Sequence, residues 1–332
     1  MRVGIVGCGL IGGKRAAALG QAQAAATQGD VLTATLDRVP ARAQALAART
    51  PGAVACTSMD ELLARVDAVV IATSNDQLTP MALAAVNAGK PTLIEKPAAR
   101  SADELAPLVA LAERRGVVVQ VGFNHRFHPS ARKARALLDS GVCGPLMFVR
   151  ARYGHGGRLG YEKEWRADPA ISGGGELIDQ GVHLIDLSRW FLGEDLGHVQ
   201  GHVGTFFWKM AVDDNAFLTL STAKGQVAHL HASCTEWKNL FSFEIYGRDA
   251  KLHLEGLGGS YGVERLYHYQ MRPEMGPPDT VIHEYPGADT SWADEWKDFS
   301  GATRGERGIG ASAADALATL RIVAEAYRTC RS

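Results

Sequence analysis

Apolar and polar residues alternate in two different ways along the chain. Up to about residue 122, short β-branched runs of strand length are separated by Ala- and Leu-rich stretches of helix length. This pattern is typical of βαβ units in a parallel sheet. Some helical stretches end at a glycine, such as Gly89 or Gly116, where a left-handed cap costs little. Strands are predicted at 2–6, 31–36, 68–72, 92–94 and 117–121, and helices at 42–49, 77–88 and 102–115.

The pattern changes after residue 123. Runs that alternate apolar and polar residues, separated by turns, now predominate, and they predict a mostly antiparallel sheet with helices over one face. Helices are predicted at 129–140, about 175–191 and 311–327, and strands at 146–152, 199–208, 216–222, 226–234, 241–246 and 251–254.

Composition narrows the class of protein. A chain of 332 residues with 46% hydrophobic residues is long enough for about two domains with sizeable cores. Its 35 basic and 36 acidic residues nearly balance, so we expect no nucleic-acid or membrane partner. The five scattered cysteines show no CxxC or zinc spacing, which favours reduced thiols in a cytoplasmic protein. The apolar run at 3–10 is interrupted by glycines, and we interpret it neither as a signal peptide nor as a membrane span.

A glycine motif follows the first predicted strand. Gly7, Gly9 and Gly12 form a GxGxxG between this strand and an Ala-rich helix. The first glycine permits a tight turn, the second lets backbone N–H groups reach a pyrophosphate, and the third lets helix pack on strand. Leu10 and Ile11 belong to the same predicted cofactor contact. The sequence therefore predicts a Rossmann domain that binds a dinucleotide.

Two charged residues after the second predicted strand bear on the choice of cofactor. Asp37 lies where an acidic residue takes the hydroxyls of the adenosine ribose, although a helix cap or turn is an alternative role. An aspartate here repels a 2′-phosphate and favours NAD. The adjacent Arg38 could hold that phosphate by a charge-assisted hydrogen bond, so NADP stays the alternative.

Further motifs follow in order along the chain. They are Thr73-Ser74-Asn75, NAGKPTLIEKP at 87–97, GFNHRFHP at 122–129 and GGGELIDQGVHLIDLSRWFLG at 173–193. With these motifs and the GxGxxG, the chain resembles the Gfo/Idh/MocA oxidoreductase family over nearly its full length. The resemblance implies an α/β fold with a Rossmann domain and an α+β domain whose mostly antiparallel sheet is open-faced. We place these domains at 1–123 and 124–310, with a final helix, 311–332, packing back on the Rossmann domain.

The resemblance also implies a function. Members commonly oxidise or reduce sugars, cyclitols and nucleotide-linked sugars, and they assemble as homodimers or homotetramers through the sheet face. Lys96 is expected to handle substrate and protons, with Asp179 and His183 completing the catalytic group. Leu78 departs from the family, because many members have a histidine in this stretch. Further cofactor contacts are expected at Thr73, Ser74, Asn75, Glu95, Lys96 and Asn124.

The chemistry explains why these residue types are needed. Oxidation of a secondary alcohol requires a base within hydrogen-bond reach of the hydroxyl. Asp179 and His183 are four residues apart on a predicted helix, which places them on one face. Lys96 follows a strand at its carboxyl end, where open α/β sheets bind ligands, and an ammonium there could stabilise a developing alkoxide. The pair could instead be a structural contact and the lysine an exposed strand end, while a metal site lacks further ligands at suitable spacing.

The remaining candidates lie around this group. Arg126, just beyond the strand at 117–121, could contact the substrate or serve the structure. The loop before the glycine triplet could form a lid, with arginines for a phosphorylated or nucleotide-linked sugar and a tryptophan to stack on a pyranose. Anchoring of the loop to the core is the alternative. The loop candidates are His155, Arg158, Trp165 and Arg166.

Two other functions use the same features. One is a glycosidase that retains NAD and cleaves its substrate by transient oxidation and elimination. The other is a non-catalytic dinucleotide sensor, against which Lys96, Asp179 and His183 argue.

Overall fold

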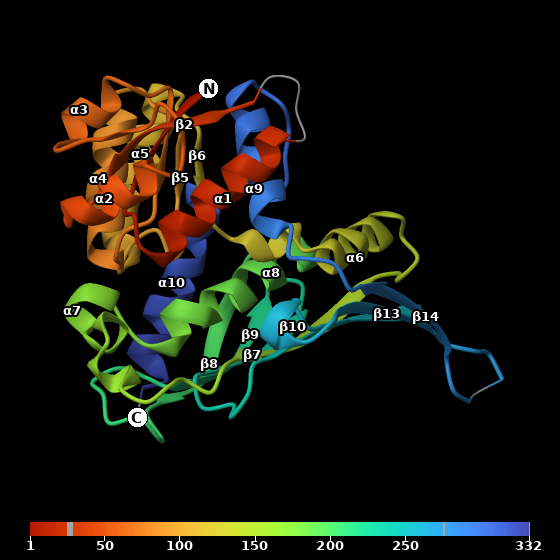
Figure 1. Ribbon diagram of the computed structural model, residues 1–332. Helices are drawn as coiled ribbons and strands as arrows, with labels where there is room; N and C mark the ends of the chain where they lie inside the picture. Colours follow the sequence, from red (N-terminus) through yellow and green to blue (C-terminus); the bar gives the residue numbers. More distant parts are fainter. Residues whose placement is uncertain (25–28, 275, 332) are drawn as a thin grey trace. The chain divides into compact units, whose positions relative to one another are not determined.

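Seven of the described strands form a sheet in the order β15-β6-β5-β4-β1-β2-β3. Figure 1 labels β2, β5 and β6 of this sheet. The structure is a computed structural model that describes residues 1–24, 29–274 and 276–331. Neighbouring strands pair in parallel except β15, which is antiparallel to β6. The strands are β1 (Arg2–Val6), β2 (Val31–Leu36), β3 (Val54–Ala55), β4 (Ala68–Ile71), β5 (Thr92–Ile94), β6 (Val119–Val121) and β15 (Ala311–Ser312).

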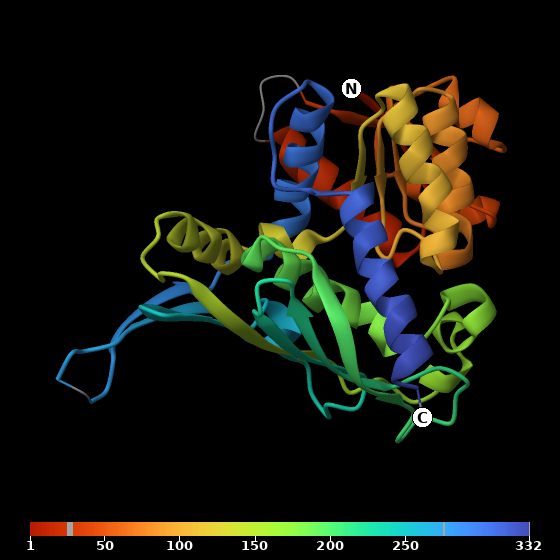
Figure 2. The same ribbon diagram turned by 180° about the vertical axis from the view of Figure 1, so that it is seen from behind.

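Helices cover both faces of this sheet. Figure 2 shows α1 and α9 side by side on one face and α4 and α5 on the other. Local sequence sets the ends of α5, because Ser101 accepts a hydrogen bond from the Glu104 N–H at its start and Gly116 adopts a left-handed conformation at its end. The helices are α1 (Leu10–Ala24), α2 (Pro40–Ala47), α3 (Met59–Leu63), α4 (Asn75–Asn87), α5 (Ala102–Arg115) and α9 (Ser291–Thr303).

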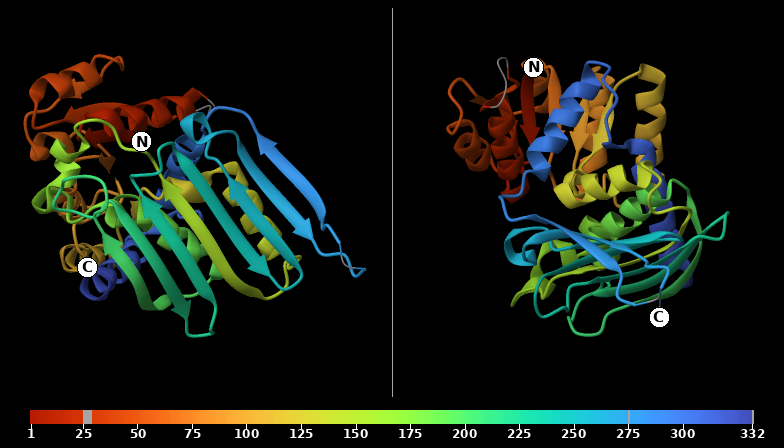
Figure 3. Two further views of the ribbon diagram at one scale, coloured as in Figure 1. Left: turned by 90° about the horizontal axis from the view of Figure 1, so that it is seen from below. Right: turned by 90° about the vertical axis from the view of Figure 1, so that its right-hand side faces the viewer.

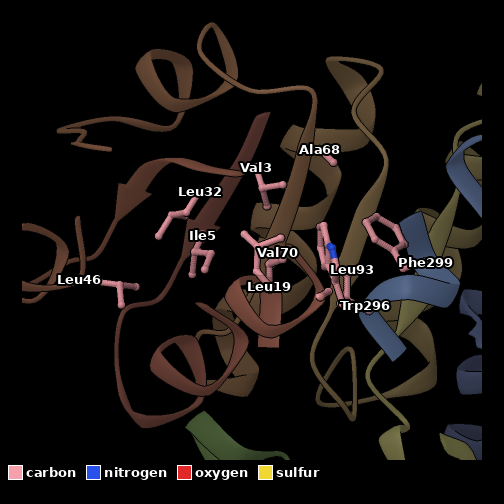
Figure 4. Close-up of a cluster of buried hydrophobic side chains, with 11 residues drawn as sticks. Val3, Ile5, Leu19, Leu32, Leu46, Ala68, Val70, Leu93, Trp296 and Phe299 are labelled. Carbon is pink, nitrogen blue, oxygen red and sulfur yellow. The ribbon is translucent and has the colours of Figure 1, made fainter. Parts of the chain in front are cut away.

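The core of the sheet includes a distant part of the chain. Trp296 and Phe299 of α9 are buried beside Val3, Leu19 and Leu93 (Figure 4). The chain accordingly divides into a first unit of residues 1–124, 170–173 and 290–317 and a second unit of 125–169, 174–289 and 318–332. We predicted 124–310 as the second domain, but residues 290–310 belong to the first unit. The reason is that aromatic side chains of α9 complete the core of the Rossmann sheet.

The second unit contains an eight-stranded sheet in the order β14-β13-β12-β11-β7-β10-β9-β8. All neighbours are antiparallel except β7 and β10. Figure 3 shows one face of this sheet without helices. The strands are β7 (Leu146–Gly154), β8 (Leu196–Gly204), β9 (Asn215–Thr222), β10 (Val227–Ser233), β11 (Leu240–Gly247), β12 (Ala250–Glu255), β13 (Glu264–Gln270) and β14 (Asp279–Tyr285).

Helices cover the other face of the second sheet. A π-helical turn, η4 (Leu177–Gly181), runs directly into α8 (Val182–Leu192), and α6 is Pro129–Asp139. The last helix, α10 (Ala313–Thr329), belongs to the second unit from residue 318 on. There the Tyr327 hydroxyl donates to Asp213 at 2.9 Å. The expectation that the C-terminal helix packs on the Rossmann domain stays a prediction.

The glycine triplet at 173–175 lies where the chain passes from one unit to the other. An added Cβ would lie 2.6 Å from the Arg100 carbonyl at Gly173, 2.1 Å from the Tyr327 hydroxyl at Gly174 and 1.9 Å from the Asp213 carbonyl at Gly175. Glycine is therefore required here by close backbone approach. None of the described helices is both long and apolar enough to cross a membrane.

Candidate active site

The three motif glycines have the backbone geometry that their predicted roles require. Gly7 has φ of +91°, and an added Cβ would lie 2.4 Å from the Ala72 carbonyl oxygen. At Gly12 it would lie 2.0 Å from the Gly7 carbonyl oxygen. Gly9 has no atom within 4 Å of this position, and α1 begins at the next residue. This geometry fits a dinucleotide pyrophosphate, because it combines a tight turn, an open approach to the helix N-terminus and close packing of the helix on the strand.

Asp37 holds this glycine loop in place. Its Oδ2 accepts from the Cys8 backbone N–H at 2.7 Å, and its Oδ1 accepts from the Val39 N–H at 2.8 Å. The turn role of Asp37 is therefore present. Each carboxylate oxygen has a second lone pair, so the same side chain can also accept from ribose hydroxyls. Arg38 beside it is exposed.

The chain between β4 and α4 contributes the next set of predicted cofactor residues. Thr73 Oγ1 is buried and has no hydrogen-bond partner among the described residues, which fits a group that a ligand satisfies. Ser74 donates to Asp76 at 2.6 Å, and Asn75 donates to the Ser172 carbonyl at 2.8 Å. Leu78 is fully buried in α4, so this residue belongs to the core.

Lys96 is the second residue after β5, in the loop that leaves the carboxyl end of this parallel strand. The loop is fixed by backbone hydrogen bonds from Glu95 N–H to the Ile71 carbonyl and from Ala98 N–H to the Glu95 carbonyl, both at 2.9 Å. The predicted position of Lys96 at the ligand-binding edge of the sheet agrees with the structure.

Glu95 and Asn124 make contacts within the first unit that the sequence reasoning did not foresee. The Glu95 carboxylate is buried and accepts from the Arg15 guanidinium at 2.6 Å. Asn124 is also buried, and it donates to the Ser291 hydroxyl at 2.9 Å. Both side chains therefore have structural partners, and their predicted cofactor contacts stay predictions.

Asp179 and His183 lie in the second unit, on the π-helical turn and the first turn of α8. A π-helical turn is rare and is frequent at functional sites. The Asp179 carboxylate accepts from Arg166 Nε at 3.1 Å. His183 is buried, with its ring 3.9 Å from the ring of His125 and 5.9 Å from that of Tyr153. The pair therefore combines a charged, arginine-bound carboxylate with an imidazole in an aromatic environment.

Three residues next to this pair escaped the sequence reasoning. The His125 ring lies tilted against the ring of His183, while Tyr153 and Tyr261 lie with their rings 5.6 Å apart. Burial, followed by the charge of Tyr261 and a hydrogen bond with it, raises the pKa of Tyr153 well above its ordinary value. Tyr153 therefore stays protonated and can donate a hydrogen bond. The alternation along β7 was the available signal for Tyr153, because it places this residue on the helix-covered face with Val149.

Arg126 forms a buried ion pair rather than an open contact. Its guanidinium donates to both carboxylate oxygens of Asp186 at 2.8 and 2.6 Å, and it lies 5.8 Å from the Trp190 ring. Of the two roles left open for Arg126, this geometry favours the structural one.

The predicted lid residues have partners within the second unit. Arg158 contacts Glu164 at 2.7 Å, and the Arg166 guanidinium lies over the Trp165 ring at 4.6 Å while it binds Asp179. His155 Nε2 is 3.8 Å from a Glu176 carboxylate oxygen. Both arginines already have carboxylate partners, which argues against a ready-made phosphate site. Their substrate contacts stay predictions.

The geometry is that of an α/β protein with a dinucleotide-binding loop, and comparisons with known proteins place it in a family. Residues 1–123 match the profile described as "Oxidoreductase family, NAD-binding Rossmann fold", and residues 131–253 match "GFO/IDH/MocA C-terminal domain". The chain belongs to the Gfo/Idh/MocA oxidoreductase family, as the motifs predicted.

Relatives with names support this assignment. The chain is 31% identical over 293 residues to "Inositol 2-dehydrogenase 2" of Saccharopolyspora erythraea, covering 87% of this chain and 77% of the relative. It is 28% identical over 207 residues to "scyllo-inositol 2-dehydrogenase (NAD(+))" of Bacillus subtilis, covering 60% of this chain and 56% of the relative. A solved structure, "Levoglucosan dehydrogenase, complex with NADH and levoglucosan", is 22% identical with a TM-score of 0.88, covering 99% and 97% of the two chains. That likeness shows the fold.

Proposed function

We propose that this oxidoreductase transfers a hydride between NAD and a secondary alcohol carbon of a cyclitol or sugar. The observation that carries the proposal is the π-helical turn that presents Asp179 and the buried His183, in a chain whose glycine loop fits a dinucleotide. The names of the relatives, inositol and scyllo-inositol dehydrogenases, support the substrate class. These names do not favour the glycosidase or the sensor.

In the proposed site, Lys96 contacts the reacting hydroxyl. When bound, the nicotinamide supplies the hydride acceptor. The ammonium of Lys96 hydrogen-bonds the substrate oxygen and stabilises the negative charge that develops when its proton leaves.

Asp179 and His183 have complementary proposed roles. An ionised carboxylate only accepts hydrogen bonds, so Asp179 binds a substrate hydroxyl on the side away from Arg166. The imidazole of His183 can accept the proton of the reacting hydroxyl near neutral pH. Whether His183 or Lys96 is the proton acceptor is decided by the pH profiles of their variants.

The experiment that tests this proposal is a turnover assay with NAD and a panel of inositols, levoglucosan and free and nucleotide-linked sugars. Lys96→Ala and His183→Ala should each lower kcat about 100-fold or more while NAD binding changes little. Lys297→Ala and Lys224→Ala, which change exposed residues outside the proposed site, serve as matched controls. The proposal fails if the site variants turn over the substrate as fast as the controls.

The open sheet face supports a proposal about assembly. It carries stacked ring pairs, Phe148 on Tyr246 at 4.2 Å and Phe217 on His231 at 4.1 Å, with Phe148 and Phe217 more than a third exposed. Aromatic residues are enriched in interface cores, and a second copy of the chain would cover them. Phe148→Glu should lower the molecular mass in light scattering to that of a smaller assembly, and an unchanged mass would rule out this face.

A further inference from the structure

A buried charge cluster lies directly beside the loop that carries Lys96. Arg15 of α1 donates from Nε to Glu95 at 2.6 Å and from Nη1 to Glu295 of α9 at 2.5 Å. Arg15 is 3% exposed, Glu95 7% and Glu295 0%. One guanidinium therefore joins three parts of the first unit that lie 80 and 280 residues apart in the chain.

Such a cluster needs a reason, because burying charges costs several kcal/mol per ion and an apolar core of the same volume is often as stable. The surrounding residues are shaped to accept it. An added Cβ at Gly122 would lie 2.6 Å from Arg15 Nη2 and 3.2 Å from Glu95 Oε2, so only glycine leaves room for the pair. The Trp292 ring lies 4.5 Å from the Arg15 guanidinium carbon and covers it from another side.

The position of each member along the chain suggests what the cluster does. Arg15 is in the helix that opens at the glycine loop, and Glu95 is covalently joined to Lys96. The side chain of Glu95 thus anchors one end of the Lys96 peptide, while its backbone is bonded to β4. If the Glu95 side chain lost its contact with Arg15, the residue before Lys96 would be held by its backbone hydrogen bonds alone.

We propose that Arg15 and Glu95 are positioning residues for Lys96, with Glu295 holding Arg15 in the geometry that serves Glu95. The inference rests on the proposed function, since it takes Lys96 as the residue that contacts the reacting hydroxyl. A misplacement of about 1 Å at a reacting group can cost about 100-fold in rate, so a buried clamp one residue away has a direct effect on turnover.

The test uses three variants that disturb the clamp in different ways. Glu95→Gln keeps the shape and removes the charge. Arg15→Lys keeps the charge, but one ammonium cannot reproduce the guanidinium fork that reaches both carboxylates. Gly122→Ala keeps all three side chains and crowds Arg15 and Glu95. Glu61→Gln, at a partly exposed glutamate of α3 in the same unit, is the matched control.

Two readouts separate positioning from general damage. The first is kcat and KM with NAD and inositol, together with the Kd for NAD. The second does not need turnover: it is the rate at which an amine-acylating reagent labels Lys96, measured by peptide mass spectrometry, with exposed Lys297 as the internal reference. We expect kcat to fall about tenfold or more and Lys96 labelling to rise several-fold, with the Kd for NAD within about twofold and Lys297 unchanged.

The outcomes distinguish this inference from the proposed function. If Lys96→Ala leaves turnover intact, the proposed function fails, and the labelling rate still decides whether Glu95 positions Lys96. If Lys96→Ala is inactive while Glu95→Gln and Arg15→Lys match Glu61→Gln in both readouts, the positioning role is overturned. Loss of NAD affinity in proportion to kcat also overturns it, because the clamp would then serve the glycine loop. Should Glu95→Gln not fold, Arg15→Lys and Gly122→Ala decide the same question.

Discussion

Asp37 is the residue whose two roles can be separated by measurement. Its carboxylate binds the Cys8 and Val39 N–H groups, and we propose that it also accepts from the ribose of NAD. Asp37→Asn keeps one oxygen for the loop but loses the charge that repels a 2′-phosphate. We expect weaker NAD binding and a ratio of NADP to NAD affinity that rises about tenfold. Fluorescence titration with both cofactors measures this, and an unchanged ratio would show that Asp37 serves only the turn.

Glu295 is a buried carboxyl group whose ionisation should affect folding. Burial raises its pKa from 4.5 to about 7; Arg15 opposes the shift, while Glu95 and Asp298 add to it. The folded protein therefore holds a proton that the unfolded chain has already released. The free energy of unfolding should fall as pH rises from about 4.5 to about 7 and then level off.

The variant Glu295→Gln isolates this effect. Its free energy of unfolding, measured by urea denaturation from pH 4.5 to 8, should lack the fall, which we expect to be on the order of 3 kcal/mol in the natural chain. Parallel curves for the two proteins would mean that Glu295 is ionised throughout the range. Glu61→Gln controls for the loss of a partly exposed carboxylate, whose pKa is instead lowered by hydrogen bonds from Thr57.

The helix α8, which carries His183, is held by the buried pair of Arg126 and Asp186. Removal of one member takes a bidentate ionic partner away from the other buried charge, and breaking a buried pair costs about 3 to 5 kcal/mol. Asp186→Ala should therefore destabilise the second unit by this amount in urea unfolding. Removing an exposed pair, with Glu325→Ala at the Arg328 contact, should cost less than about 1 kcal/mol. Equal costs for the two variants would contradict the structural role of Arg126.

An element could be predicted well when the sequence pattern that defines it lies within the element itself. β1 and β2 have the predicted ends, because each is a β-branched run bounded by turn residues. β14 escaped prediction because its residues are mostly exposed and do not alternate at an edge strand. The helix α9 has an amphipathic pattern, but no local pattern tells which of two cores Trp296 and Phe299 will enter.

The same distinction applies to the site. The glycine loop could be predicted because its residues are close together in the sequence. Asp37 could be predicted because it lies at the end of a strand. The contact of Arg15 with Glu95 and Glu295, and that of His125 with His183, could not, since their partners meet only after the sheets have formed. Arg126 illustrates the limit, because its motif suggested two roles and only its contact with Asp186 favours one.

Over the whole molecule, the account depends on residues from two units acting on one substrate. Lys96 comes from the first unit, and Asp179 and His183 from the second. A crystal structure of the protein with NADH and an inositol tests this directly. The account predicts that Lys96 Nζ and a ring nitrogen of His183 both lie within about 3 Å of the same substrate hydroxyl, with Asp179 on a neighbouring hydroxyl. A bound inositol whose reacting hydroxyl is contacted by neither Lys96 nor His183 would contradict it.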